Sequence, residues 1–144
     1  MAKAKILVVD DESKIRESFS DILSLEDFDV DTAQNGEEAI NLIEEDFYDV
    51  ALIDLNMPKV DGMEVLKYLV DHSIDTIGII LTGYATIRTA VEAMKAGAFD
   101  YLAKPVKMEE VIMVINRALE FRDIKRENVS LKSQLKKKYK FDNF

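Results

Sequence analysis

The stretch KILVVDDES (residues 5–13) joins an unbroken apolar run to two adjacent aspartates, Asp10 and Asp11. A run that is apolar at every position, rather than at alternate ones, is typical of a central parallel strand covered on both faces. Two neighbouring carboxylates repel each other, so a buried strand should not end in them without a reason. The pair is either a turn that caps the next helix or part of a binding site.

Four more short segments have the pattern of strands, and two of them are likewise continuously apolar. Between these segments, apolar residues recur at three- and four-residue steps, as on one face of a helix. The sequence predicts strands at Lys5–Asp10, Phe28–Thr32, Val50–Asp54, Ile77–Thr82 and Phe99–Leu102. It predicts helices at Ser13–Glu26, Gly36–Glu45, Gly62–Asp71, Thr86–Ala96 and in a long stretch from Met108, with Ser13 as an N-cap and Gly97 as a C-terminal stop.

Five strand–helix units in alternation predict a doubly wound α/β fold, in which helices cover both faces of a parallel sheet. Right-handed crossovers place the carboxyl ends of all strands at one edge of that sheet. In such folds the ligand site lies in the crevice at that edge. We therefore expect the residues that follow the strands to be neighbours in space.

Composition limits the classes of protein to which the chain can belong. Its 144 residues, 48% apolar and 33% charged, fit one folded domain with a short appendage. The absence of cysteine excludes disulfides and thiolate metal sites, and without a long apolar run or a secretion signal we expect a cytoplasmic protein with no membrane contact. Residues 1–116 carry 24 acidic and 10 basic side chains and should bind nucleic acid poorly, whereas residues 117–144 carry 9 basic and 4 acidic ones.

Chemically active side chains follow four of the predicted strands: Asp10 and Asp11, Asp54, Thr82, and Lys104. Three close carboxylates need a cation or a proton to coexist, and oxygen ligands without His or Cys favour a hard ion such as Mg²⁺. Lys104 is a mobile positive charge suited to a phosphoryl group, Thr82 is a hydroxyl donor, and Asp54 is a candidate nucleophile. Each residue alone is common at a strand end, but their coincidence at one edge predicts phosphoryl transfer.

The segments LVVDDE, DLNMPKVDGMEVL and ILTGYATIRTAVEAMKAGAFDYLAKP contain these residues. Over roughly residues 4–120, the chain resembles the receiver domain of two-component response regulators. The resemblance implies a flavodoxin-like five-stranded sheet of order 2-1-3-4-5. It also implies that a sensor histidine kinase transfers a phosphoryl group to Asp54, and that Mg²⁺ is bound by Asp10, Asp11, Asp54 and the backbone carbonyl of Asn56.

The same resemblance assigns roles to residues on the other side of the crevice. Lys104 contacts the phosphoryl group, and the Lys104–Pro105 peptide bond is expected in the cis form. Thr82 and Tyr101 form a switch pair, in which Thr82 moves toward the phosphoryl group and Tyr101 turns into the space that it vacates. The surface that changes is the face of the fourth helix, fifth strand and fifth helix, through which we expect a homodimer.

The last helical pattern continues far beyond the length that one domain face needs. Residues at alternating three- and four-residue steps, as at the a and d positions of a coiled coil, are Val114, Arg117, Phe121, Ile124, Asn128, Leu131, Leu135 and Lys138, of which the apolar ones and Asn128 are the candidate dimer contacts. An asparagine at an a position fixes the register of a parallel two-stranded coil. A helix that merely covers the domain would explain the first half of this seam. From Phe121 onward we expect no further domain surface and favour self-association.

The segments GYATIRTAVEAMKAGAFDYLAKP and RENVSLKSQLKKKYKFDNF together resemble the nitrogen-regulation (NtrC-like) class of sigma-54-dependent transcriptional activators. In that class a linker leads from the receiver to an AAA+ ATPase domain, and the whole protein acts with sigma-54 RNA polymerase on DNA. We therefore expect a fragment with a receiver at 1–120, a helical coiled-coil linker at 121–138 and the start of the ATPase domain at 139–144. No G-x-x-x-x-G-K-[ST] motif is present, so this chain is not expected to bind ATP in that way.

Two other interpretations use the same crevice. An Asp-nucleophile phosphatase would act on external substrates, but such enzymes usually place a second acid two residues after the nucleophile, where this chain has Asn56. A stand-alone receiver would only bind partners, which the long tail disfavours. We expect a phosphoacceptor that assists its own phosphorylation and dephosphorylation, rather than an enzyme.

Overall fold

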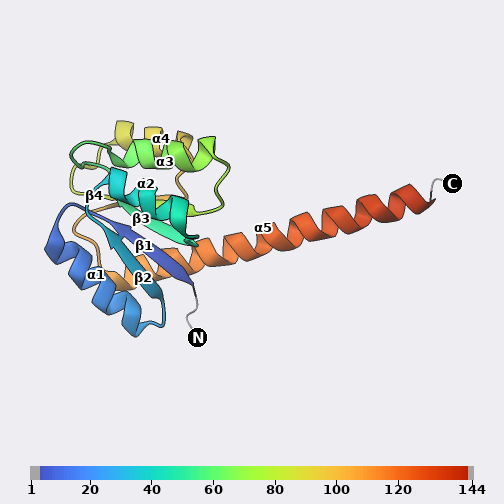
Figure 1. Ribbon diagram of the computed structural model, residues 1–144, viewed down its shortest axis with the longest axis horizontal. Helices are drawn as coiled ribbons and strands as arrows, with labels where there is room; N and C mark the ends of the chain where they lie inside the picture. Colours follow the sequence, from blue (N-terminus) through green and yellow to red (C-terminus); the bar gives the residue numbers. More distant parts are fainter. Residues whose placement is uncertain (1–3, 143–144) are drawn as a thin grey trace.

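The computed structural model of the chain describes residues 4–142, with side chains through residue 135. It contains one parallel five-stranded sheet of order β2-β1-β3-β4-β5, with helices on both faces (Figure 1). The doubly wound fold and the strand order expected from the sequence are confirmed. The strands are β1 (Lys5–Val9), β2 (Asp29–Ala33), β3 (Val50–Asp54), β4 (Ile77–Thr82) and β5 (Asp100–Ala103). The helices are α1 (Ser13–Leu25), α2 (Gly36–Glu45), α3 (Gly62–Asp71), α4 (Ile87–Lys95) and α5 (Met108–Asp142).

The start of α1 differs from the sequence prediction. β1 ends at Val9, so Asp10 and Asp11 lie in the connection to α1 rather than in the strand. The N-cap is Glu12, whose backbone is extended (φ −90°, ψ 117°), and Ser13 is the first helical residue instead of the cap. The cause is Asp10, whose carboxylate accepts a hydrogen bond from the Glu12 N–H at 3.0 Å and turns the chain before Ser13.

The residues of β1 show why this strand is apolar at every position. Ile6 and Val8 belong to the core layer that α1 and α5 cover, whereas Leu7 and Val9 belong to the layer on the opposite face, under α2 and α3 (Figure 1). All four side chains are at most 2% exposed. Burial of a side chain of this kind contributes about 1.5–3 kcal/mol, so both faces of the sheet stabilise the fold.

The strand register aligns the carboxyl ends of neighbouring strands. Asp54 at the end of β3 pairs with Leu81 of β4, and Thr82, the next residue, pairs with Ala103 at the end of β5. β1 pairs with β3 through Val9, so the connection that follows β1 opens at the same edge. Residues almost a hundred positions apart in the sequence are therefore brought together by the register of the sheet.

The first part of α5 packs on the domain, and this contradicts one predicted member of the linker seam. Val114 is 2% exposed and belongs to the core layer beneath the sheet, so it is not available to a second chain. Contacts with the domain also continue past the expected limit. The Phe121 ring centroid lies 5.5 Å from that of Phe99, and Arg122 forms an ion pair with Asp49. The expectation that no domain surface remains from Phe121 onward is therefore wrong.

Beyond Arg122, α5 projects from the domain as a single helix (Figure 1). The later apolar residues of the seam are exposed, with Ile124 at 65%, Leu131 at 51% and Leu135 at 53%. The helix runs unbroken to Asp142, so the boundary expected at residue 138 is not a helix end, and residues 143–144 lie outside the described part of the chain. Within residues 4–142, no helix combines the length and the apolarity needed to cross a membrane.

Candidate functional site

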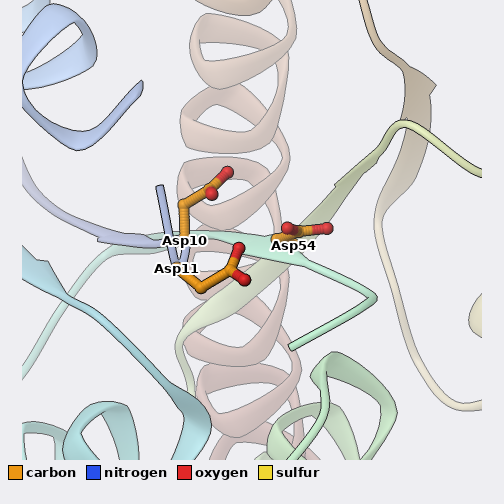
Figure 2. Close-up of side chains that lie close together, drawn as sticks. All are labelled: Asp10, Asp11 and Asp54. Atoms are coloured by element: carbon orange, nitrogen blue, oxygen red, sulfur yellow. The ribbon is translucent and has the colours of Figure 1, made fainter. Parts of the chain in front are cut away.

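Three carboxylates gather at the carboxyl edge of the sheet. Asp10 and Asp11 come from the connection after β1 and Asp54 from the end of β3, and one oxygen of each lies within 4.8 Å of the others (Figure 2). Asp10 and Asp54 are 3% and 7% exposed, whereas Asp11 faces solvent. The structure thus brings together the three acids that were singled out in the sequence.

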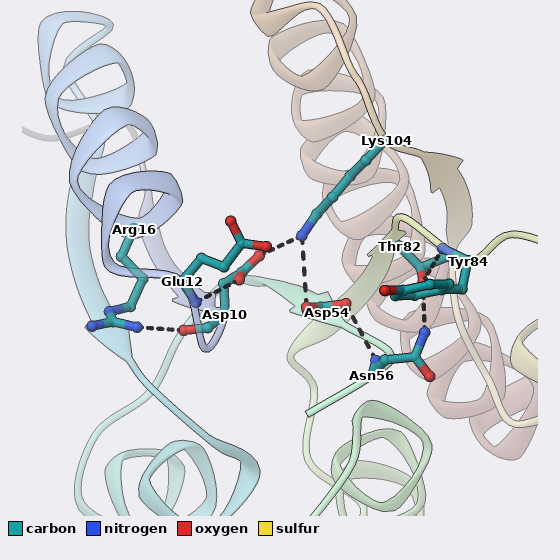
Figure 3. Close-up of polar contacts among 8 residues, drawn as sticks. All are labelled: Asp10, Glu12, Arg16, Asp54, Asn56, Thr82, Tyr84 and Lys104. Carbon is teal, nitrogen blue, oxygen red and sulfur yellow. Dashed lines mark hydrogen bonds and ion pairs between the residues drawn. The ribbon is translucent and has the colours of Figure 1, made fainter. Parts of the chain in front are cut away.

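Hydrogen bonds fix the backbone and the carboxylate of Asp10. Its N–H donates to the Ala33 carbonyl of β2 at 3.1 Å, and its carbonyl accepts from the Arg16 guanidinium at 2.7 Å. With the Glu12 N–H on the carboxylate, these contacts hold a buried acid in one orientation (Figure 3). Arg16 was not predicted as a site residue, since its only signal in the sequence is its place in the first turn of the helix that follows the acid pair.

The end of β3 is held closely against the start of α3. The Asn56 N–H donates to Asp54 Oδ1 at 3.2 Å, and the Gly62 N–H donates to the Leu55 carbonyl at 3.1 Å. A Cβ on Gly62 would lie 2.5 Å from the carbonyl oxygen of Asp54, so only glycine permits this approach. From the sequence, Gly62 was predicted only as the start of a helix, because the pattern does not show that this helix approaches Asp54 so closely.

Lys104 reaches the two buried acids from the loop after β5 (Figure 3). Its ammonium donates to Asp10 Oδ2 at 2.7 Å and lies 3.6 Å from Asp54 Oδ2. The Lys104 N–H donates to the Thr82 carbonyl at 2.8 Å, and the Lys104–Pro105 peptide bond is cis. The lysine expected to contact a phosphoryl group therefore lies beside the aspartate expected to receive it.

Burial and neighbouring charges shift the pKa values of Asp54 and Lys104. Burial raises the pKa of the Asp54 carboxyl, and the negative charges of Asp10 and Asp11 raise it further. The positive charge of Lys104 lowers the pKa, but not enough to return it to the ordinary aspartate value. Burial alone would lower the pKa of Lys104, but its hydrogen bond to Asp10 and the nearby acids outweigh burial and raise it. Lys104 is therefore a permanent positive charge, while Asp54 ionises less readily than an exposed aspartate.

The Thr82 hydroxyl is fully buried and accepts two hydrogen bonds. The Asn56 side-chain amide donates to Thr82 Oγ1 at 3.1 Å, and the Tyr84 N–H donates to the same oxygen at 3.2 Å (Figure 3). Two accepted bonds leave the hydroxyl hydrogen of Thr82 available for donation. The contact between the Asn56 amide and Thr82 was not predicted, because spacing along the chain does not show that the amide reaches Thr82.

Tyr101, the second member of the expected switch pair, faces α4. It is half-buried on β5, where it pairs with Ile80 of β4 and packs against the core. Its hydroxyl lies 2.6 Å from Thr89 Oγ1. The structure therefore places Tyr101 outside the acid cluster, in contact with the helix whose surface is expected to change.

The donor atoms of the acid cluster fit a hard divalent cation. Asp10, Asp11 and Asp54 offer only carboxylate oxygens, and the chain has no cysteine and a single histidine. Mg²⁺ prefers oxygen ligands and is usually held by one or two carboxylates together with water and phosphate oxygens. The three negative charges, offset in part by Lys104, favour a cation at this position.

Comparison with known proteins agrees with this geometry. The family model of the response regulator receiver domain matches residues 6–116. The regulatory protein AtoC of Escherichia coli K12 is 40% identical over 123 residues, which cover 85% of this chain and 27% of AtoC. The crystal structure of a CheY-like response regulator receiver domain protein from Methanospirillum hungatei has a TM-score of 0.81 and 31% identity, over 85% of this chain and 98% of that one.

A longer protein of known structure is also similar. The crystal structure of NtrX from Brucella abortus in complex with ATP has a TM-score of 0.84 and 34% identity, over 91% of this chain and 30% of the NtrX chain. The present chain thus spans less than a third of the length of AtoC and of NtrX. The family match includes the acid cluster, Thr82, Tyr101 and Lys104. The chain therefore belongs to the family of response regulator receiver domains.

Proposed function

We propose that the chain is a signalling switch in which Asp54 accepts a phosphoryl group from a sensor histidine kinase. The observation that carries this proposal is the surroundings of Asp54, a buried carboxylate that shares a 4.8 Å cluster with Asp10 and Asp11 and lies 3.6 Å from the Lys104 ammonium. Three acids and one lysine leave the cluster negative, which suits a cation, and that cation together with Lys104 would supply the positive charge that an incoming phosphoryl group needs. Membership of the receiver family supports the same assignment.

The transfer needs one nucleophile and a positive environment for the phosphoryl oxygens. An oxygen of Asp54 forms a bond to phosphorus while the bond between phosphorus and the donor histidine breaks, and the imidazole nitrogen keeps the electron pair. Lys104 offers its ammonium to a phosphoryl oxygen. Asp10, Asp11, Asp54 and the Asn56 carbonyl would hold Mg²⁺, which when bound neutralises negative charge on the reacting oxygens.

The response to phosphorylation begins with charge. The phosphoryl group carries up to about two negative charges and three strong acceptor oxygens, in a crevice where Asp54 had held one carboxylate charge. Thr82 can donate its free hydroxyl hydrogen to one of these oxygens, which draws it away from the Asn56 amide. Tyr101 then turns toward the vacated space, and the face made by α4, β5 and α5 changes together with the homodimer that it forms.

We further propose that the exposed seam of α5 joins two chains in a parallel coiled coil, through Ile124, Asn128, Leu131 and Leu135. In the longer protein, the unphosphorylated dimer would hold two ATPase domains apart, and phosphorylation would release them to act with sigma-54 RNA polymerase on DNA. The resemblance of the tail to the NtrC-like linker supports this, as does the likeness to NtrX, whose structure contains ATP.

The site acts on its own phosphoryl group in the cytoplasm rather than on external substrates. Asp-nucleophile phosphatases usually place a general acid two residues after the nucleophile, and here that position holds Asn56. Its amide donates to Thr82 and cannot protonate a leaving group as a carboxylic acid does. The proposal therefore favours a phosphoacceptor over a turnover enzyme.

Incubation of the chain with Mg²⁺ and acetyl phosphate should add the mass of one phosphoryl group. Asp54→Asn should abolish the gain, because an amide is not a carboxylate nucleophile, whereas Asp75→Asn, an exposed acid just before β4 at the opposite edge of the sheet, should keep it. Intact-mass spectrometry measures the gain directly. A comparable label on the Asp54→Asn variant would refute the assignment, and fast multiple turnover of an unrelated phosphoester would favour the phosphatase.

A further inference from the structure

The hydroxyl of Tyr101 is held by a residue that the proposed function has not used. Thr89 Oγ1 lies 2.6 Å from the Tyr101 hydroxyl oxygen, and both side chains are half-buried. Thr89 is the third residue of α4, so this hydrogen bond joins the first turn of that helix to β5. It is the direct polar link between Tyr101 and the helix whose face is expected to respond.

The Thr89 hydroxyl also belongs to the cap of α4. It accepts from the Thr86 N–H at 3.1 Å and lies 3.1 Å from the Thr86 carbonyl, to which it can donate, while the Thr86 hydroxyl lies 3.0 Å away. With Tyr101, this makes four polar neighbours for one hydrogen and two lone pairs. The four contacts compete, so the bond to Tyr101 and the capping box of the helix are coupled through one oxygen.

The position of α4 depends strongly on such end contacts. Of its nine residues, Ala93 alone is buried, whereas Ile87, Val91 and Met94 are 86%, 46% and 49% exposed. A helix with so little buried surface gains little from packing, and it can shift at small cost once its end contacts change. Those exposed apolar side chains lie on the face through which the proposed homodimer forms.

We propose that Thr89 is a positioning residue, which holds Tyr101 in the unphosphorylated arrangement and passes its release on to the cap of α4. The inference rests on the proposed function, because it assumes that Tyr101 turns when Asp54 is phosphorylated. Tyr101 must give up the Thr89 bond in order to turn, so this bond favours the unphosphorylated state. Its loss frees the Thr89 hydroxyl to rearrange the contacts with Thr86 and so changes the start of α4.

Beryllofluoride mimics a phosphoryl group on Asp54. The test therefore titrates the full chain and its variants with beryllofluoride in saturating Mg²⁺ and compares the midpoint concentrations of binding. Thr89→Val removes the hydroxyl but keeps the branched shape, and it should lower the beryllofluoride midpoint about two- to tenfold, the range for one net hydrogen bond. Thr89→Ser restores the hydroxyl and should return the midpoint to the wild-type value. Thr86→Ala weakens the same cap but leaves the Thr89–Tyr101 bond, so it should lower the melting temperature without a comparable shift of the midpoint.

A second measurement follows Tyr101 itself. In protein labelled with 3-fluorotyrosine, the Tyr101 signal is identified by its loss in Tyr101→Phe, and in free Thr89→Val it should move toward its beryllofluoride-bound position. Equal midpoints for wild type and Thr89→Val, or an equal shift with Thr86→Ala, would overturn the inference and leave the proposed function standing. Failure of the wild-type chain to bind beryllofluoride with Mg²⁺ would instead overturn the proposed function itself.

Discussion

The Asp54 carboxylate is placed where its charge is unfavourable. Burial disfavours its ionised form, Asp10 and Asp11 repel it, and Lys104 compensates only in part, so its pKa lies above the ordinary aspartate value. A carboxylate selected only for stability would be fully compensated by its partners or exposed to solvent. The same repulsion makes the cluster receptive to a cation, so the proposed function and the lost stability have one cause.

We expect Asp54→Asn to stabilise the fold at neutral pH in metal-free buffer. Because the folded-state pKa is raised, the folded chain binds more protons than the unfolded chain between the ordinary value of 3.8 and the raised pKa. The stability of the wild type therefore falls as pH rises through that window, and the full cost is present above it. Asparagine does not ionise, so its advantage in urea unfolding should be largest at neutral pH and should vanish toward pH 3.8.

Excess Mg²⁺ is the control for this pH effect. A cation that binds the folded wild type stabilises it by mass action, so the advantage of Asp54→Asn should shrink when Mg²⁺ is added. Parallel stability profiles for the two proteins across the whole pH range, with and without Mg²⁺, would show that the charge of Asp54 is not a cost to the fold.

The first part of α5 packs on the domain, and the part after Arg122 projects from it. Val114 is buried against the sheet, and Arg122 still pairs with Asp49 at the start of β3. Leu131, a d position of the pattern in which Val114 is an a position, is 51% exposed. One periodic pattern thus covers two environments, the core of a single chain and a surface open to a second chain.

Truncation of one apolar residue in each part should separate these roles. Val114→Ala removes buried methyl groups from a packed core and should lower the free energy of unfolding by about 2 kcal/mol. Leu131→Ala should leave unfolding of the receiver within about 0.5 kcal/mol of wild type but weaken self-association. Urea unfolding and sedimentation velocity measure the two effects, and a loss of fold stability in Leu131→Ala comparable to that of Val114→Ala would contradict this division.

The sheet connects two functional ends of the molecule. The acid cluster lies at the carboxyl edge of the strands, whereas α5 is anchored at the amino edge, where Asp49 accepts from the Lys5 N–H at 2.9 Å and pairs with Arg122. The ion pair between Arg122 and Asp49 thus joins the basic C-terminal segment (residues 117–144) to the acidic part of the chain (residues 1–116).

Two deletions should test where the receiver ends. Removal of residues 123–144 keeps Phe121 and Arg122 in place, so the receiver should fold with near-native stability, whereas loss of the exposed seam should weaken self-association in sedimentation. Removal of residues 117–144 also takes Ala118, which is fully buried, and should destabilise the fold clearly. An unchanged dimer mass after the shorter deletion would exclude the coiled-coil linker, and equal stability of the two deletions would contradict the domain limit.

Much of the fold and the site follows from the sequence through local rules. The apolar run before Asp10 required a strand buried on both faces, and the repeated strand–helix order required a parallel sheet with its carboxyl ends together. Asp54, Thr82 and Lys104 were placed correctly at that edge because strand ends are set by sequence pattern. Ser13 was misplaced as a cap because a hydrogen bond from Glu12 to Asp10, which no propensity describes, sets that turn.

Sequence alone thus determined the sheet, the edge that carries the acids, and the residue types that meet there, because strand periodicity and crossover handedness leave few other arrangements. Tertiary structure alone decided which side chain contacts each switch residue, the Asn56 amide at Thr82 and the Thr89 hydroxyl at Tyr101. It also decided that Val114 belongs to the core rather than to a dimer seam. The physical reason is that helical spacing gives a face but not its partner, and hydrogen-bond partners far apart in the chain meet only once helices and strands pack.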